Sequence, residues 1–180
     1  MTLALPPEPP LRALLARLER ERLPHALGGS GLLGSLGLVE RVNDWDVTVD
    51  ADVETLAAAF ADVPFERHGH GGGHADHKLA FAEQRVELIA RFAFFTSAGV
   101  VRIPTIVTRR WRGLPIGSPS GWAVAYALLA EHEASDRRRE RSEALFAWLE
   151  REGADAALPR LLEQPLPPAL RARLERLRAA

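Results

Sequence analysis

Polar and apolar side chains alternate over residues 44–50, which read Asp-Trp-Asp-Val-Thr-Val-Asp. Neighbouring side chains of a β-strand point to opposite faces, so this pattern predicts a half-buried strand. The apolar members would then face a core, while Asp44 and Asp46 project together from the other face. Two carboxylates this close repel each other unless a cation lies between them, and Mg²⁺ prefers such oxygen ligands. The pattern therefore predicts a core face and a candidate metal-binding face on one strand.

A glycine-rich turn and a third acid add to this candidate site. Gly28-Gly29-Ser30 lies upstream, between a short apolar stretch and the predicted start of a helix. Glycines let a backbone approach a phosphate closely, and free N–H groups at a helix N-terminus favour an anion. Glu87 is the only acid in the apolar run 85–89, where burying it is costly unless it is paired or metal-bound. Together these features indicate nucleotide phosphoryl chemistry.

Each feature alone has a simpler interpretation. A Gly-Gly-Ser sequence is usually a plain turn, alternating aspartates usually form a solvated face, and a lone strand glutamate usually lies on an exposed edge. The charge distribution bears on the choice: residues 43–66 hold seven acids and no lysine or arginine, and residues 88–130 hold five arginines and no acid. Such blocks suit a site that holds cations beside a polyanion, or they are solvated faces.

Hydrophobic periodicity and capping signals predict the order of helices and strands. After an extended lead-in at 6–10, we expect helices at 11–22, 31–38, 53–61 (capped by Asp52), 119–133 (capped by Ser118) and 136–152 (capped by Asp136), with two short helical patterns beyond residue 155. We expect strands at 25–27, 45–49, 65–67, 78–82 and 85–92, an edge strand at 100–108, and loops at 68–77 and 109–117. This order predicts an α/β (α+β) fold, with a mixed β-sheet flanked by helices and a helical C-terminal extension.

Composition excludes several classes of protein. The chain has no cysteine, which rules out disulfide scaffolds, thiolate zinc sites and cysteine nucleophiles. No stretch of about 18 apolar residues is present, so we expect no transmembrane helix and no membrane partner. A cytoplasmic protein is the simplest interpretation.

The acidic motif and the turn before it resemble the signature of the polymerase-β-type nucleotidyltransferase superfamily. That signature has a Gly-Ser at a helix start (here Gly29 and Ser30), a spacer, an Asp-x-Asp on a strand (Asp44 and Asp46), and a third acid on a later strand (Glu87). The chain resembles the small single-domain members, in which a Ser-Pro-capped helix and a charge-rich helix follow. The resemblance covers about residues 23–149. It implies the nucleotidyltransferase fold, with a lead-in and helix at 1–22, a nucleotidyltransferase-like domain at 23–152 and a helical tail at 153–180.

The resemblance implies a Mg²⁺- or Mn²⁺-dependent enzyme that moves a nucleoside monophosphate from a nucleoside triphosphate to a hydroxyl acceptor. Asp44, Asp46 and Glu87 would be the catalytic and metal-binding residues, with Glu87 also activating the acceptor hydroxyl. The nucleotide phosphates would be held by Gly28, Gly29, Ser30 and Arg91. Arg91 is included because strand alternation places it on the face of Glu87. The acceptor is left open among a small molecule such as an aminoglycoside, a protein and an RNA end.

The chain departs from the family pattern in one helix. Members often carry a lysine or arginine in the helix after the Ser-Pro cap, where it contacts phosphates, but residues 122–130 contain no base. Tyr126 or the arginines at 137–139 would have to substitute. The departure keeps a second hypothesis open, a catalytically weak or inactive binding module such as a toxin–antitoxin component, with arginines 137–141 as its interface. A third is a structural α/β domain with an exposed Asp-x-Asp row far from the glycine turn.

Two further segments have open roles. The loop at 68–77 contains four histidines and four glycines, so it is either a Zn²⁺ or Ni²⁺ site, with His70, His74 and His77 as a ligand set, or a mobile flap or plain loop. Four arginines of the tail interleave with leucines, a pattern that suits packing on a neighbouring element or on a second copy, as in a homodimer (Arg171, Arg173, Arg176 and Arg178).

Overall fold

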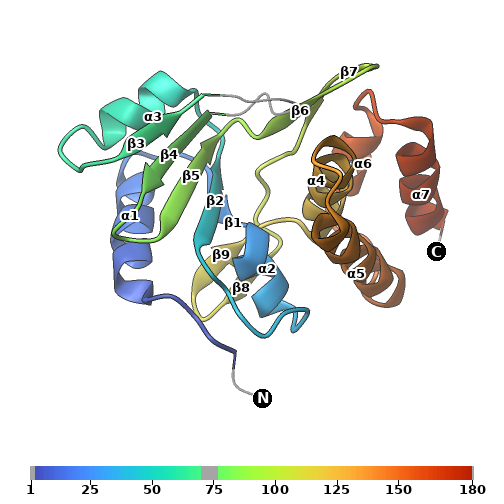
Figure 1. Cartoon of the computed structure of the whole chain (residues 1–180), viewed down its shortest axis with the longest axis horizontal. Helices are drawn as coiled ribbons and strands as arrows, with labels where there is room; N and C mark the ends of the chain where they lie inside the picture. Colours follow the sequence, from blue (N-terminus) through green and yellow to red (C-terminus); the bar gives the residue numbers. More distant parts are fainter. Residues whose placement is uncertain (1–2, 70–76, 180) are drawn as a thin grey trace.

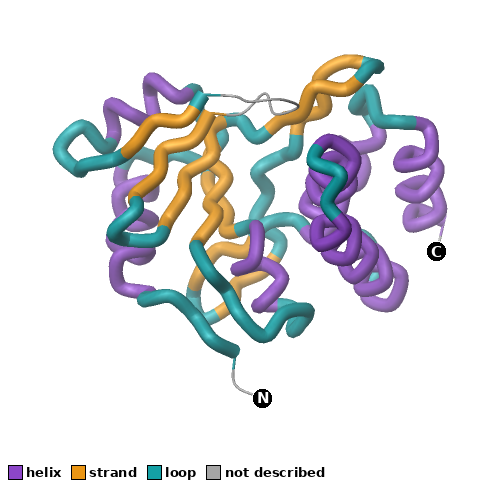
Figure 2. The backbone as a smooth tube through the Cα atoms, in the orientation of Figure 1, coloured by secondary structure: helices purple, strands orange, loops and turns teal. Residues whose placement is uncertain are grey.

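A computed structural model describes residues 3–69 and 77–179 of the chain (Figure 1, Figure 2). The helices and strands of the first half are α1 (Glu8–Arg20), β1 (His25–Leu27), α2 (Gly29–Ser35), β2 (Trp45–Val49), α3 (Val53–Ala59), β3 (Glu66–His68), β4 (His77–Phe81) and β5 (Val86–Ala90). Those of the second half are β6 (Ala93–Thr96), β7 (Gly99–Arg102), β8 (Arg109–Trp111), β9 (Leu114–Ile116), α4 (Pro119–His132), α5 (Asp136–Glu152), α6 (Leu158–Leu162) and α7 (Pro168–Ala179).

Among the described residues, the main sheet has seven strands in the order β3-β4-β5-β2-β1-β9-β8, and β6 and β7 form a separate two-stranded sheet. Strand β2 pairs in parallel with β5 and antiparallel with β1, so the sheet is mixed. Helices α1 and α3 lie to one side of the sheet, whereas α4 to α7 gather at the other side of the molecule (Figure 1). The predicted α/β (α+β) architecture with a helical C-terminal part is therefore confirmed.

The apolar face of β2 forms the centre of the core, as its alternation predicts. Trp45, Val47 and Val49 are fully buried, and the leucines of α1 pack into the same core cluster. Trp45 also donates from its indole Nε1 to the carbonyl of Pro7 at 3.3 Å, which links the strand to the residue before α1. Burying an indole is favourable when its N–H finds such a partner. The other face of β2 is left to its polar side chains.

Helix α1 begins earlier than predicted. The segment 6–10 was expected to be extended, but Pro9 and Pro10 lie in the first turn of α1, after an N-cap at Pro7. The first N–H groups of a helix have no intrahelical partner, so proline loses nothing there. The prediction of Asp136 as the cap of α5 is also wrong by one residue, because the hydroxyl of Ser135 accepts from the N–H of Arg138.

The segment 109–117 is a hairpin rather than the predicted loop. Strands β8 and β9 pair through Trp111 and Leu114, and the two residues between them have φ values of 53° at Arg112 and 79° at Gly113. Two consecutive positive φ values are the mark of a type I′ turn, whose twist matches paired strands. The expected edge strand at 100–108 is confirmed only in its first residues, because β7 ends at Arg102 and pairs with β6 in the separate two-stranded sheet.

The caps of α3 and α4 are confirmed. The carboxylate of Asp52 accepts from the N–H of Thr55 at 2.8 Å, and Ser118 accepts from the N–H of Gly121 at the same distance. Ser118 in turn donates to Asp155 at 2.7 Å, so a residue beyond α5 holds the start of α4. The boundaries proposed at residues 22 and 152 stay predictions. Among the described helices, none is both long and apolar enough to cross a bilayer.

Asp155→Ala is expected to lower the free energy of unfolding by about 3 kcal/mol, because the carboxylate accepts from both the Ser118 hydroxyl and the Ser120 N–H, and bonds to charged groups contribute roughly 1.5–3 kcal/mol each. Urea unfolding followed by circular dichroism measures this loss. Glu150→Ala, an exposed change on α5, is the control and is expected to stay within about 0.5 kcal/mol of the parent. Equal effects of the two substitutions would contradict the prediction.

Candidate active site

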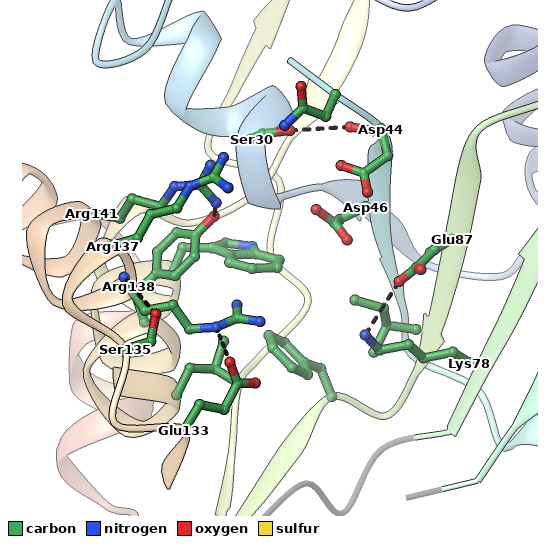
Figure 3. Close-up of a pocket in the computed structure, with 16 residues that line it drawn as sticks. Ser30, Asp44, Asp46, Lys78, Glu87, Glu133, Ser135, Arg137, Arg138 and Arg141 are labelled. Atoms are coloured by element: carbon green, nitrogen blue, oxygen red, sulfur yellow. Dashed lines mark hydrogen bonds and ion pairs between the residues drawn. The ribbon is translucent and has the colours of Figure 1, made fainter. Parts of the chain in front are cut away.

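A cleft of about 430 Å³ opens between the sheet and the C-terminal helices (Figure 3). The residues that line it come from several distant segments of the chain: Ser30, Asn43, Asp44, Asp46, Lys78, Glu87, Ile89, Phe92, Trp122, Tyr126, Leu129, Glu133, Ser135, Arg137, Arg138 and Arg141. The carboxylates of the predicted site lie on the sheet side, and arginines of α5 lie on the opposite side. The cleft thus has one acidic wall and one basic wall.

Strand pairing creates the acidic wall. Asp46 lies directly opposite Glu87 across the parallel β2–β5 pair, so both side chains emerge on the same face of the sheet. Asp44 directly precedes β2 and points into the cleft beside Asp46 (Figure 3). Strand alternation therefore puts Asp44 and Asp46 on one face, and strand pairing adds Glu87 to it.

The Gly28–Ser30 turn contacts this wall directly. The N–H of Gly28 donates to the carbonyl of Asp46 at 2.8 Å, and the hydroxyl of Ser30 donates to the carbonyl of Asp44 at 3.2 Å. Gly29 has a φ of +51°, and a Cβ on it would lie 1.7 Å from Oδ2 of Asp46. Only glycine fits there, because the left-handed conformation and the carboxylate both exclude a side chain. The structural-domain hypothesis, which requires the acidic row to lie far from this turn, does not agree with these contacts.

Lys78 is a cleft residue that the sequence interpretation missed. It lies on β4, two positions from Ala80, the residue paired with Glu87, and its Nζ contacts Oε2 of Glu87 at 3.2 Å. Both side chains are about one-third exposed. Two features of the sequence could have indicated Lys78. It lies on a predicted strand next to the strand of Glu87, and it is the one lysine among the 23 lysine and arginine residues of the chain.

The environment of Asp46 makes its charge unfavourable. The pKa of Asp46 is raised to about 7, chiefly by burial and then by the neighbouring charges of Asp44 and Glu87, against smaller opposing effects of Lys78 and Arg141. A carboxyl with such a pKa gains strongly from a bound cation, because the cation offsets both the burial and the repulsion.

The basic wall comes from α5 and supplies what α4 lacks. Arg137, Arg138 and Arg141 line the cleft, whereas Arg139 pairs with Asp136 at 2.6 Å. Arg138 itself pairs with Glu133, which lines the same wall, at 2.5 Å. Arg141 donates to the hydroxyl of Tyr126 at 3.2 Å. Burial raises the pKa of Tyr126, so this residue offers a neutral hydroxyl. Tyr126, Arg137 and Arg138, which were predicted to substitute for a basic residue in α4, thus line the cleft. Arg141 lines it in place of the predicted Arg139.

Of the predicted site residues, Ser30 and the three acids line the cleft, Gly28 and Gly29 lie behind its acidic wall, and Arg91 does not reach it. Arg91 follows β5 with a φ of 48°, which ends the strand alternation on which the prediction rested. Its guanidinium instead lies 3.8 Å from the carboxylate of Asp52. Of the proposed histidine set, His70 and His74 lie outside the described residues, while His77 begins β4.

The side chains of the cleft are of the kind that bind a divalent cation, but they are not arranged as a complete set of metal ligands. Hard cations prefer carboxylate oxygens, and three acids face the same space. Within the described ranges, no group of three or more acidic or histidine side chains is close enough to enclose a metal ion. Glu87 is instead held by Lys78, so it would have to turn from this lysine to act as a ligand.

Gly29→Ala is expected to lower the free energy of unfolding by about 2 kcal/mol more than Gly37→Ala, measured by urea unfolding. Both glycines have positive φ values, but a Cβ at Gly37 would have no atom within 4 Å, whereas one at Gly29 would overlap the Asp46 carboxylate. Gly37→Ala is therefore a control for backbone strain alone. Equal losses would show that the carboxylate moves away at no cost.

Asp46→Asn is expected to stabilise the metal-free protein increasingly as the pH rises. The raised pKa means that the folded state holds a proton between pH 4 and about 7 that the unfolded state releases, so the parent loses stability over this window. One pKa unit corresponds to about 1.4 kcal/mol, which gives a gain of about 2 to 4 kcal/mol at pH 8 and almost none at pH 4.

Urea unfolding in a chelator at a series of pH values measures this difference. Asp62→Asn is the control, because Arg17 lowers the pKa of Asp62 and no gain is expected at pH 8. A difference for Asp46→Asn that does not change between pH 4 and 8 would contradict the assigned environment.

Comparison with known proteins agrees with this architecture. No protein-family model matches the chain, and no curated protein matches it in sequence. Among solved structures, the solution structure of the antibiotic-resistance factor ANT(2'')-Ia aligns with 94% of this chain and 88% of its own, at 16% identity and a TM-score of 0.57. The crystal structure of ANT(2'')-Ia with adenylyl-2''-tobramycin aligns with 94% of this chain and 95% of its own, at 13% identity and a TM-score of 0.55. This chain therefore has the nucleotidyltransferase fold.

Proposed function

We propose that this protein is a Mg²⁺-dependent nucleotidyltransferase that transfers a nucleoside monophosphate from a nucleoside triphosphate to a hydroxyl group. The observation that carries the proposal is the pairing of an acidic wall with a basic wall across one cleft. A triphosphate and its cations need this arrangement, because carboxylates hold the cations and guanidinium groups hold the phosphate oxygens. The nucleotidyltransferase fold of the chain supports the same reaction class.

In this proposal Asp44 and Asp46 hold Mg²⁺ with the triphosphate, and Glu87 is the third carboxylate. Bound Mg²⁺ supplies positive charge that makes the α-phosphorus easier to attack and the pyrophosphate a better leaving group. Glu87 accepts the proton of the acceptor hydroxyl, whose oxygen forms a bond to the α-phosphorus while the bond from that phosphorus to pyrophosphate breaks. Arg141 lies on the opposite wall, from which it would stabilise the developing negative charge, and Arg138 would join it on leaving Glu133.

The acceptor is a hydroxyl compound of unassigned class. ANT(2'')-Ia was solved with adenylyl-2''-tobramycin, a nucleotidylated aminoglycoside, and an aminoglycoside hydroxyl is therefore one candidate acceptor here. Proteins and RNA ends remain the other candidates. A cytoplasmic location and a homodimer are parts of the proposal that rest on the sequence alone.

One observation favours a second function, a nucleotidyltransferase-like binding module without strong catalysis. Lys78 forms an ion pair with Glu87 at 3.2 Å. The described residues also form no group of three or more ligands that could hold a metal ion. In such a module the arginines at 137–141 would be the interface with a partner such as the other half of a toxin–antitoxin pair. Neutralising the acids would then leave the biological effect intact, and substitutions in these arginines would abolish it.

Calorimetric titration with ATP, and then with the other triphosphates, tests the enzyme. We expect Mg²⁺-dependent binding to the parent protein and a loss of at least about tenfold in affinity for Asp44→Asn/Asp46→Asn, because the variant removes the charges that hold the cation. Glu54→Gln/Asp62→Asn, two exposed acids outside the cleft, is a matched control with the same change of charge. Failure of every triphosphate to bind would overturn the catalytic proposal and leave the binding module.

A further inference from the structure

A second cavity lies near the cleft. It is lined by arginines that have no role in the proposed reaction. It has a volume of about 340 Å³ and is lined by Asp50, Arg91, Phe92, Arg102, Ile103, Pro104, Thr105 and Arg160. Phe92 lines both this cavity and the cleft, so the two spaces lie on either side of one residue. We refer to the second space as the arginine cavity.

Tertiary contacts bring the three arginines together from distant parts of the chain. Arg91 follows β5, Arg102 ends β7 and Arg160 lies on α6. Gln164 links the last two, because its side chain accepts from the N–H of Arg102 at 3.1 Å and donates to the carbonyl of Arg160 at 3.3 Å. The clustering is thus a result of how the β6–β7 hairpin meets the C-terminal helices.

The charges of the cavity are not balanced by the protein itself. Three arginines and one acid, Asp50, are among the described residues that line the cavity, which gives this lining a formal charge of +2. Arg91 is also 3.8 Å from Asp52, but Arg102 and Arg160 make no ion pair with any acid in the described part of the chain. Guanidinium groups match the planar geometry of carboxylates and phosphates, so this cavity suits an anionic group.

The remaining arginines of the basic block at 88–130 have other partners. Arg109 lies over the ring of Trp148 at 4.9 Å, Arg110 donates to the carbonyl of Gly113 at 3.0 Å, and Arg112 pairs with Glu8 at 2.6 Å. Only Arg91 and Arg102 of this block line the arginine cavity. The unexplained part of the block therefore lies at one place, beside the cleft.

We propose that the arginine cavity binds an anionic group, a phosphate or a carboxylate, of the hydroxyl acceptor. The proposal rests on the proposed nucleotidyl transfer and assigns the acceptor to a chemical class. Glu87 and Arg91 lie four residues apart, so their Cα atoms are separated by at most about 13 Å, the span of four extended residues. An acceptor of modest size spans this distance, with its anionic group among the arginines and its hydroxyl near Glu87. A polycation would find the wrong charge there.

Arginine side-chain NMR tests the cavity directly. The probes are glycerol, glycerate and glycerol 3-phosphate, which share hydroxyl groups and differ in carrying no charge, a carboxylate or a phosphate. We expect glycerate or glycerol 3-phosphate, but not glycerol, to shift the Nε–H signals of Arg102 and Arg160 saturably. Arg102→Ala/Arg160→Ala should weaken this binding by about tenfold or more, since the variant removes two guanidinium groups that would pair with the anion.

Arg110→Ala is the matched control, because it removes an exposed arginine of the same block that does not line the cavity. Unchanged anion affinity in Arg102→Ala/Arg160→Ala would overturn the proposal. The titrations are repeated with saturating Mg-ATP: an unchanged affinity supports an acceptor subsite, whereas displacement by Mg-ATP assigns the cavity to the triphosphate and overturns it. Absence of Mg-ATP binding in the same samples would overturn the proposed function, while the anion titration still decides the cavity.

Discussion

Repulsion between carboxylates on one face of a packed sheet is the constraint around which the rest of this molecule is arranged. Parallel pairing of β2 with β5 puts Asp46 opposite Glu87, and Asp44 adds a third charge beside them. The cost is visible in the pKa of Asp46, which burial and its neighbours raise to about 7. Lys78 and Arg141 offset part of that cost. The same arrangement explains why the site is suited to cations, since a bound cation relieves the repulsion that the fold imposes.

On the basic side of the cleft, arginines of α5 take the place of the basic residue that α4 lacks. Helix α4 is buried along most of its length and packs against α5. A lysine or arginine on its buried face would lose hydration without a partner. The neighbouring helix α5 is exposed on its outer face, so its arginines reach the cleft rim at no such cost, and Tyr126 supplies a neutral hydroxyl below them. Asp155 holds the start of α4 in place through Ser118 and Ser120.

Identity of 13–16% to ANT(2'')-Ia is compatible with a common fold because few positions carry the geometric demands. Gly29 must lack a side chain beside Asp46, and the strand residues must alternate between core and cleft. Most other positions need only suitable size and polarity. The choice of acceptor does not follow from the fold. In the proposal it depends on surfaces such as the arginine cavity, whose side chains the fold does not require.

Local signals in the sequence were enough to predict several elements. Alternation fixed β2 and the shared face of Asp44 and Asp46, and capping residues fixed the starts of α3 and α4. The sequence did not reveal the turn at Arg112 and Gly113, whose left-handed conformation is stable because the flanking strands pair. Long-range packing, in contrast, places Lys78 against Glu87 and α5 opposite the acids, and it places Arg91 in one cavity with Arg102 and Arg160. These contacts join residues far apart in the chain, and local periodicity carries no information about which distant elements will pack together.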